Sequence, residues 1–192
     1  MKLKQANLDR DPKHLSIAVE INRVRASLIV DTAAPQSCIA RNRLKKFRLV
    51  EQKTTQRIIY GLDVKSAVNE FLCIGKLNTL AVANCRITNV PVAIDEIPFL
   101  DGIFGFDEMH RIGAVLDCAE PALYFARRGP SSRTSDKLAA MLQSNGFTQV
   151  PLRLNSDHHL EVDCSIDGVP STMLVDTGSQ FTFVDESIET KS

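Results

Sequence analysis

The sequence predicts an all-β protein in which one two-strand unit occurs twice. Residues 14–34 and 159–179 align without a gap, at a constant separation of 145 positions (176 − 31 and 159 − 14). Each copy reads as an alternating apolar strand, a polar turn, a continuous apolar strand, and then Asp-Thr. In both copies a carboxylate, Asp31 or Asp176, therefore directly follows a strand that the pattern predicts to be buried.

The first copy contains the clearest strand signals. Leu15, Ile17 and Val19 alternate with polar or small residues, and the run 27–30 is continuously apolar, as in a strand buried on both faces. Pro35 prevents a helix from starting straight after this run, so residues 31–37 are predicted to form a loop. Residues 1–12 are polar, and we expect a loose lead-in there.

Further elements are expected between residues 38 and 125, mostly short strands. They are a short helix over 38–47, a β-hairpin over 57–72 with its turn at 61–63, short strands at 80–82 and 90–94, an apolar strand within 99–107 bracketed by glycines, and a closing hairpin of 113–117 with 122–125. Asp107 is a plausible N-cap for a helical turn over 108–111.

Composition then marks a connecting segment before the second copy. Residues 127–133 read as a linker, and a helix is predicted over 136–143, with Ser135 as its cap and Gly146 just past its end. Strands are expected at 150–154, 160–166 and 172–175. This pattern predicts one complete lobe at 13–128, a linker with a short helix at 129–147, and the incomplete start of a second lobe at 148–192.

Charge and cysteine usage exclude several classes of function. The chain has 23 basic and 23 acidic residues, so we expect neither nucleic acid nor an anionic membrane as a partner. The five cysteines are scattered, which favours reduced thiols in a cytoplasmic protein. His158 and His159 would point to opposite faces of a strand, so no metal site is predicted, and no cofactor. No apolar run is long enough to span a bilayer.

The repeated motif carries a family resemblance. Asp-Thr-Ala-Ala at 31–34, Asp-Thr-Gly-Ser at 176–179 and the downstream Ile103-Phe104-Gly105 together resemble the retropepsin-like aspartic proteases. The resemblance implies a closed, acid-protease-like β-barrel lobe with short helices, followed by a partial second lobe. It also implies a peptide or protein substrate, with the two lobes paired as a homodimer or as a pseudo-dimer within one chain.

The same resemblance assigns roles to individual residues. Asp31 and Asp176 would be the catalytic pair, and the hydroxyls of Thr32 and Thr177 would hydrogen-bond across to the opposite loop. Ala33, Gly178 and Ser179 would complete the two active-site loops, with the Ser179 hydroxyl able to bond its own Asp176. Tyr60 and Gly61 would belong to a flap that closes over substrate, and Ile103, Phe104 and Gly105 would support the loops from below.

The chemistry explains why two carboxylates are required. Held close together, they cannot both ionise easily, so they share one proton, and one acts as base while the other acts as acid. Two alternatives stay open. Either aspartate could be an ordinary turn residue. The chain could also be a non-catalytic, protease-derived peptide-binding or dimerisation module, because Ala33 adds a methyl group where the family has glycine.

Overall fold

Two β-sheets make up most of the computed structural model, which describes residues 3–10, 14–60, 68–126, 132–185 and 188. The elements in chain order are β1 (Leu3–Arg10), β2 (Leu15–Ile21), β3 (Val24–Val30), β4 (Cys38–Ala40), η1 (Arg41–Arg43), α1 (Leu44–Phe47), β5 (Gln52–Tyr60), β6 (Val68–Val82), β7 (Cys85–Asp95), β8 (Gly102–Phe104), α2 (Phe106–Ile112), β9 (Ala114–Asp117), β10 (Ala122–Ala126), α3 (Ser132–Ser144), β11 (Arg153–Leu154), β12 (Leu160–Ile166) and β13 (Val169–Leu174).

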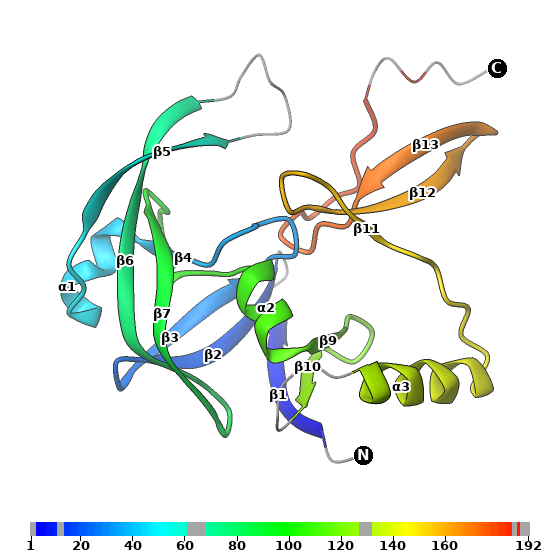
Figure 1. The fold of residues 1–192 in the computed structure, drawn as a ribbon, viewed down its shortest axis with the longest axis horizontal. Helices are drawn as coiled ribbons and strands as arrows, with labels where there is room; N and C mark the ends of the chain where they lie inside the picture. The colour runs from blue at the N-terminus through cyan, green and yellow to red at the C-terminus, as the bar shows by residue number, and fades with distance from the viewer. Residues whose placement is uncertain (1–2, 11–13, 61–67, 127–131, 186–187, 189–192) are drawn as a thin grey trace.

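The larger sheet closes on itself into a six-stranded barrel. Its strand order is β5-β6-β7-β4-β8-β3-β2-β1-β10-β9, and an additional pairing of β6 with β2 joins the ring β6-β7-β4-β8-β3-β2. The closing contact is antiparallel, with Val19 opposite Val82. Closure leaves these strands without free edges, and the predicted all-β fold with a closed barrel lobe is confirmed (Figure 1).

One large apolar cluster fills the barrel interior. Along β3, Ala26, Leu28 and Val30 are buried in it, whereas Arg25 and Ser27 on the other face are exposed, so the two-residue period sets which face points inward; Ile29, also on that other face, is buried as well. Fully burying a side chain such as Leu28 is worth roughly 1.5–3 kcal/mol. The largest fully buried side chains are Phe47, Phe104, Phe125, Ile17, Ile21, Leu28, Ile39, Leu77, Leu80, Leu123, Val30 and Val82.

A parallel strand pair fixes the place where the Asp31 loop leaves the barrel. β3 runs beside β8 with Ile29 opposite Ile103 and Val30 opposite Phe104. The amide of Asp31 continues this ladder by donating to the carbonyl of Phe104 at 3.1 Å. Asp31 therefore emerges where β8 turns into α2.

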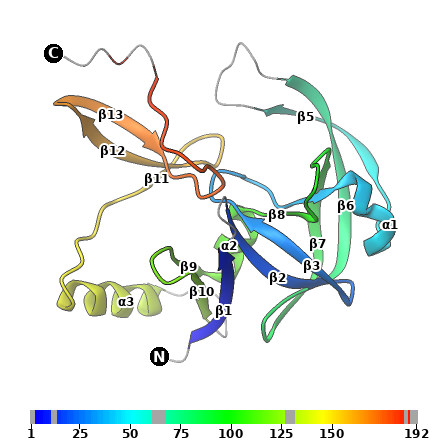
Figure 2. The ribbon, with the colours of Figure 1, turned by 180° about the vertical axis from the view of Figure 1, so that it is seen from behind.

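The second sheet is small and contains the second copy of the repeated unit. It has three antiparallel strands, β11-β12-β13, and α3 lies between β10 and this sheet in the chain (Figures 1 and 2). Its apolar side chains are less covered than those of the first copy. Phe181 and Phe183 are 70% and 69% exposed, and their rings contact edge to face at 6.4 Å.

Several expectations from the sequence are wrong. Residues 3–10 are not a loose lead-in: they form β1, which pairs with β10 and β2, and Ala6 and Leu8 are buried. A polar stretch can act as a strand when only alternate side chains enter a core. The predicted helix over 38–47 begins as strand β4 and becomes helical only from Arg41.

Other boundaries differ as well. Residues 80–82 are the end of the long strand β6, α3 begins at Ser132 and so precedes Ser135, and residues 150–152 are not in a strand. Asp107 does not cap α2, because Gly105 is the N-cap and Asp107 lies in the first turn. The antiparallel pairing of β5 with β6 and of β9 with β10 confirms the strands of both predicted hairpins, whereas the predicted turn at 61–63 lies outside the described residues.

Candidate active site

Two loops from opposite ends of the sequence meet between the barrel and the small sheet. One follows β3 and contains Asp31-Thr32-Ala33-Ala34; the other follows β13 and contains Asp176-Thr177-Gly178-Ser179 (Figures 1 and 2). Four hydrogen bonds join the two loops, and each loop donates two of them and accepts the other two.

Thr32 and Thr177 form these four bonds. The Thr32 amide donates to Oγ1 of Thr177 at 3.1 Å, and the Thr177 amide donates to Oγ1 of Thr32 at 3.1 Å. The Thr32 hydroxyl donates to the carbonyl of Val175 at 2.6 Å, and the Thr177 hydroxyl donates to the carbonyl of Val30 at 2.8 Å. This reciprocal pattern has the two-fold symmetry of the sequence repeat.

The aspartate of each loop is held by its own backbone in the same way. Oδ1 of Asp31 accepts from the amides of Ala33 and Ala34 at 2.8 and 3.1 Å. Oδ1 of Asp176 accepts from the amides of Gly178 and Ser179 at 2.8 and 3.1 Å. The equal distances show that the methyl group of Ala33 does not distort its loop. In each carboxyl group, Oδ2 makes neither of these amide bonds.

The Asp31 carboxyl group lies against the opposite loop. A Cβ atom placed on Gly178 would come within 2.5 Å of Cγ of Asp31, so only glycine leaves room for it. Burial, and next the negative charge of Asp176, raise the pKa of Asp31 above its ordinary value of 3.8, although the amides of Ala33 and Ala34 act in the opposite direction. Asp31 is half-buried, whereas Asp176 is exposed to solvent.

A second network fastens the Asp31 loop to the barrel. The amide of Gly105 donates to Oγ of Ser37 at 3.0 Å, and that hydroxyl donates to Oδ1 of Asp107 at 2.6 Å. The amide of Ser37 donates to the same carboxylate oxygen at 2.9 Å. The amide of Phe106 donates to the carbonyl of Ala34 at 2.8 Å. The start of α2 therefore holds the loop at Ala34 and Ser37, whereas β8 holds its first residue, Asp31.

The sequence analysis missed Ser37 and Asp107 as supports of the loop. Asp107 was considered there only as a helix cap, and nothing in the spacing of the two residues marks them as partners, because they are 70 residues apart. Burial raises the pKa of Asp107, and its bonds to Ser37 lower it by a smaller amount. Oδ1 of Asp107 accepts hydrogen bonds from the amide and the hydroxyl of Ser37 and from the amide of Glu108. This oxygen therefore orders the turn into α2.

The remaining predicted site residues are accounted for as follows. Phe104 is fully buried beneath the Asp31 loop, and Ile103 lies beside Ile29 in the sheet. The Ser179 hydroxyl donates to the carbonyl of Phe181 and not to Asp176, which corrects that expectation. Tyr60 is the last residue of β5, and Gly61 lies outside the described residues.

Other kinds of site find no support in the described part of the chain. Its His, Cys, Asp and Glu side chains contain no group of three or more that could hold a metal ion. Within the same residues, no helix is long and apolar enough to cross a bilayer. The described residues Cys38, Cys73, Cys85 and Cys164 lie outside any disulfide.

Comparison with known proteins finds a family that resembles the barrel. Residues 17–107 match the family model described as aspartyl protease. The matched range runs from β2 to the start of α2, so this part of the chain is similar to the aspartyl proteases. Both the first Asp-Thr motif and Ile103-Phe104-Gly105 lie within the matched range. No curated protein matches the chain by sequence.

Solved structures of aspartic proteases are among those similar to this chain. A retropepsin-like aspartic protease from Rickettsia conorii is 14% identical, over 65% of this chain and 91% of that one, with a TM-score of 0.44. The retroviral protease-like domain of Ddi1 from Leishmania major is 19% identical, over 59% and 89% of the two chains, with a TM-score of 0.44. The EIAV protease with the inhibitor HBY-793 is 19% identical, over 55% and 93%, with a TM-score of 0.40.

The hydroxyl group of Thr32 gives a direct test of the contact between the loops. Thr32→Val keeps the shape of the side chain but leaves the Val175 carbonyl and the Thr177 amide without their partner. Thr32 is only 9% exposed, so we expect a loss of about 1–3 kcal/mol in the free energy of unfolding, measured by urea denaturation. Thr32→Ser keeps the hydroxyl and should lose much less. Equal stability of the two variants would contradict the contact.

Proposed function

We propose that this protein is an aspartic endopeptidase that hydrolyses peptide bonds with a water molecule activated between Asp31 and Asp176. The observation that supports it most strongly is the reciprocal bonding of Thr32 and Thr177, because it joins the two loops that carry like carboxyl groups. Both groups come from one chain, so a pseudo-dimer suffices and no second copy is needed. We retain the division into a lobe at 13–128, a linker at 129–147 and a second lobe from 148.

The different environments of the two carboxyl groups suggest their roles. Asp31 is half-buried and its pKa is raised, so it is the group that holds the shared proton and delivers it to the substrate. Asp176 is open to solvent and accepts the proton of the attacking water. A proton shared in this way belongs to the pair, and activity should follow the titration of both groups together.

The substrate in this proposal is an extended peptide or protein segment. The hairpin of β5 and β6, with β5 ending at Tyr60, serves as the flap that covers the bound segment; Gly61 is assigned to the flap by the family resemblance alone. An extended backbone bound between this hairpin and the carboxyl groups can form hydrogen bonds like those of a β-strand, with its side chains alternating between two sets of pockets.

A second candidate is a module that binds peptides without cleaving them. It is favoured by Ala33, which places a methyl group in the first loop where the second loop has Gly178. The two functions share the binding step and differ only in hydrolysis, so one experiment separates them.

The experiment is a peptidase assay on the purified chain. A peptide library is incubated at pH values from about 3 to 7, and the products are mapped by mass spectrometry. We expect internal cleavage that is strongest at acid pH and is blocked by a statine-type transition-state analogue, but not by chelators. Binding of peptides without any cleavage would select the second candidate, and neither binding nor cleavage would exclude both.

A further inference from the structure

A hollow of about 400 Å³ opens on the outer face of the barrel beside Asp31. Ile29 and Ser27 of β3 line it, and alternate residues of a strand lie on one face. Asp31 follows β3 directly, two residues after Ile29, so the Cα atoms of these two residues are about 7 Å apart in an extended chain. A peptide bound across the two aspartates would therefore extend a neighbouring side chain into it.

The loop before β8 forms the opposite wall and contributes apolar surface. Phe99 and Leu100 both line the hollow. Phe99 is 94% exposed and has a φ of 66°, a left-handed conformation that costs a bulky residue energy. An exposed aromatic ring in a strained backbone beside a cavity is typical of a segment that closes over a ligand.

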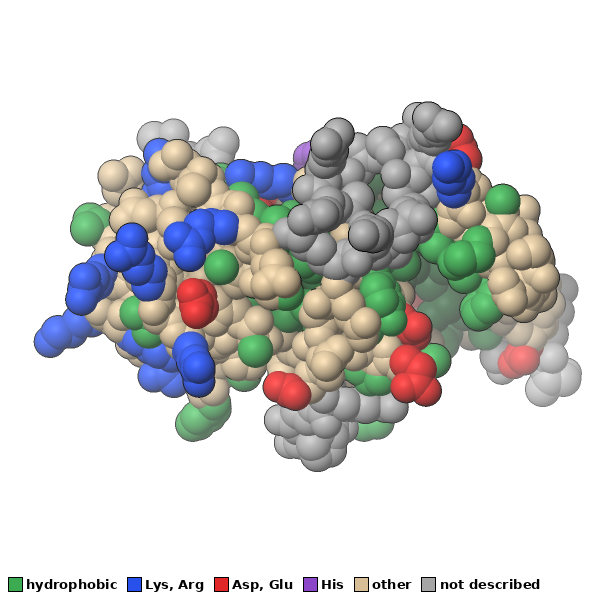
Figure 3. Space-filling model, turned by 90° about the horizontal axis from the view of Figure 1, so that it is seen from below, with side chains coloured by type: hydrophobic (Ala, Val, Ile, Leu, Met, Phe, Trp, Pro, Cys, Tyr) green, Lys and Arg blue, Asp and Glu red, His purple; other side chains and the backbone are tan. Residues whose placement is uncertain are grey.

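The end of the hollow away from Asp31 is basic. Lys46 Nζ lies 2.8 and 2.9 Å from the two carboxylate oxygens of Asp101, and Arg43 Nε lies 3.1 Å from Oδ1 of Asp101. Two cations thus surround one carboxylate, which leaves one net positive charge. Figure 3 shows further Lys and Arg side chains gathered over the barrel end of the molecule.

Two buried nitrogen atoms of the hollow have no hydrogen-bond partner among the described residues. They are Nε of Arg43, which is close to Asp101 but poorly aligned with it, and Nδ1 of His14. The Nε of Arg43 is always a hydrogen-bond donor, so a ligand that supplied a well-aligned acceptor to it would be favoured here. The other ring nitrogen of His14 lies 3.3 Å from the side-chain amide of Gln180, beside the Asp176 loop.

We propose that this hollow is a specificity subsite for an acidic side chain, glutamate above all, of the peptide substrate. The proposal rests on the proposed function and adds a substrate class to it. The glutamate methylene groups pack against Ile29 and Leu100, and its carboxylate reaches Arg43 and Lys46, which the shorter aspartate side chain reaches less well. Ion pairing with Arg and Lys favours a carboxylate over an uncharged amide of the same shape.

The experiment compares matched peptides that carry Glu or Gln at one position. Their central amide is replaced by a reduced, non-cleavable bond, and binding to the purified chain is measured by fluorescence anisotropy while the position is moved along the peptide. At one position next to the central bond, the Glu peptide should bind about tenfold more tightly than the Gln peptide. The preference should shrink as salt is raised.

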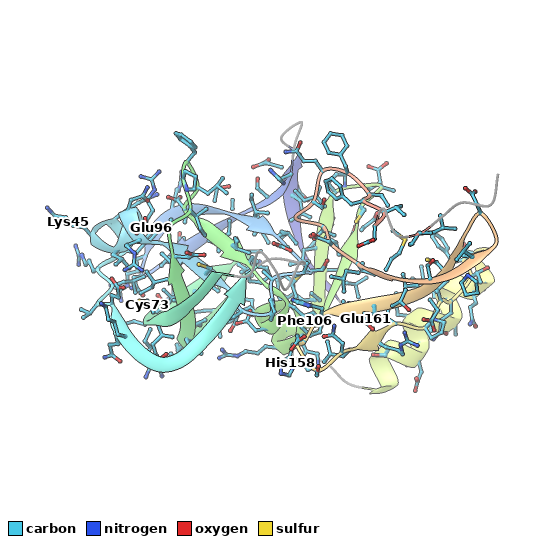
Figure 4. All side chains as sticks on the ribbon, turned by 90° about the horizontal axis from the view of Figure 1, so that it is seen from above. Lys45, Cys73, Glu96, Phe106, His158 and Glu161 are labelled. Carbon is cyan, nitrogen blue, oxygen red and sulfur yellow. The ribbon has the colours of Figure 1, made fainter. Side chains whose placement is uncertain are left out.

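Three variants test whether the preference for Glu over Gln arises in the hollow. Lys46→Gln should reduce the Glu preference severalfold, and Asp101→Asn, which removes the competing carboxylate, should increase it. Lys45→Gln is the matched control: Lys45 is exposed on the same short helix, does not line the hollow, and points away from the body of the protein (Figure 4). The control should leave the preference unchanged, and circular dichroism reports whether each variant folds.

The possible failures are distinguishable. Peptides that bind without a preference for Glu at any position overturn the subsite while leaving the proposed function in place. A preference that survives Lys46→Gln and Asp101→Asn unchanged also overturns it. If no peptide is bound or cleaved at any pH, both the subsite and the proposed function are refuted.

Discussion

Asparagine in place of either Asp31 or Asp176 is expected to lower peptidase activity by about 10³-fold or more. An amide of the same shape can neither accept the proton of water nor return it to the leaving nitrogen. The loop bonds should survive, because the side-chain oxygen that accepts from the Ala33 and Ala34 amides, or from Gly178 and Ser179, is retained. Initial rates on a cleaved peptide measure the effect.

The matched control is Asp167→Asn. Asp167 lies in the exposed turn between β12 and β13 with a φ of 48°, a conformation that asparagine also tolerates, so its activity should equal that of the wild type. Mixing the Asp31→Asn and Asp176→Asn proteins should restore nothing, because both carboxyl groups of the pair come from one chain. Activity that persists in both variants would refute the proposed mechanism, and activity regained on mixing would point to pairing between chains.

The same Asp31→Asn variant should be more stable than the wild type near neutral pH. The pKa of Asp31 is raised in the folded protein, so ionising it costs stability as the pH rises through the folded pKa, and this cost is absent below the ordinary value of 3.8. The variant should therefore unfold at a higher temperature at pH 7 and at the same temperature as the wild type near pH 3. A gain that is equal at both pH values would show that burial and Asp176 are not its cause.

The second large effect is expected from Gly105→Ala, which should destabilise the protein by several kcal/mol or prevent folding. A Cβ atom at this position would lie 2.8 Å from the carbonyl oxygen of Ala34, the carbonyl carbon of Gln36 and the amide nitrogen of Ser37. All three are backbone atoms of the Asp31 loop, so none can rotate away. The backbone conformation itself does not require glycine, because φ is −88°; the cost is steric.

Gly146→Ala separates this effect from an ordinary glycine substitution. Gly146 has a φ of 86° just past α3, and an added Cβ would meet nothing within 4 Å. We expect it to lose only about 1 kcal/mol in the free energy of unfolding, from backbone strain. If Gly105→Ala proved as mild as this in chemical denaturation, the close packing of β8 beneath the Asp31 loop would be contradicted.

Some of the site was predictable from sequence because it is local and repeated. A strand followed by Asp-Thr and a small residue places a carboxylate on the backbone amides two and three residues later, whatever the surroundings. The resemblance also implied the crossing bonds of Thr32 and Thr177. Two contacts could not be predicted from the sequence: the hydrogen bond of Ser37 with Asp107, and the ion pairs of Arg43 and Lys46 with Asp101. Both contacts join residues that come together only when the barrel forms.

β1 shows why a polar stretch was misread. Its hydrophobic signal is weak, and it becomes a strand because it pairs with β10 along Leu3–Asn7 and with the part of β2 that β6 leaves unpaired, residues 15–17. Edge pairing of this kind depends on which strands lie nearby, and that is a property of the closed fold.

The order of residues alone determined the β class of the fold, the duplication and the two aspartates that it repeats, because strand alternation and turn chemistry act over a few neighbouring positions. Tertiary structure decided that the two loops meet within one chain, that Asp31 is the more buried carboxyl group, and that a basic hollow lies beside it. Those features depend on distances between segments as much as 145 residues apart, which are fixed only when the barrel closes.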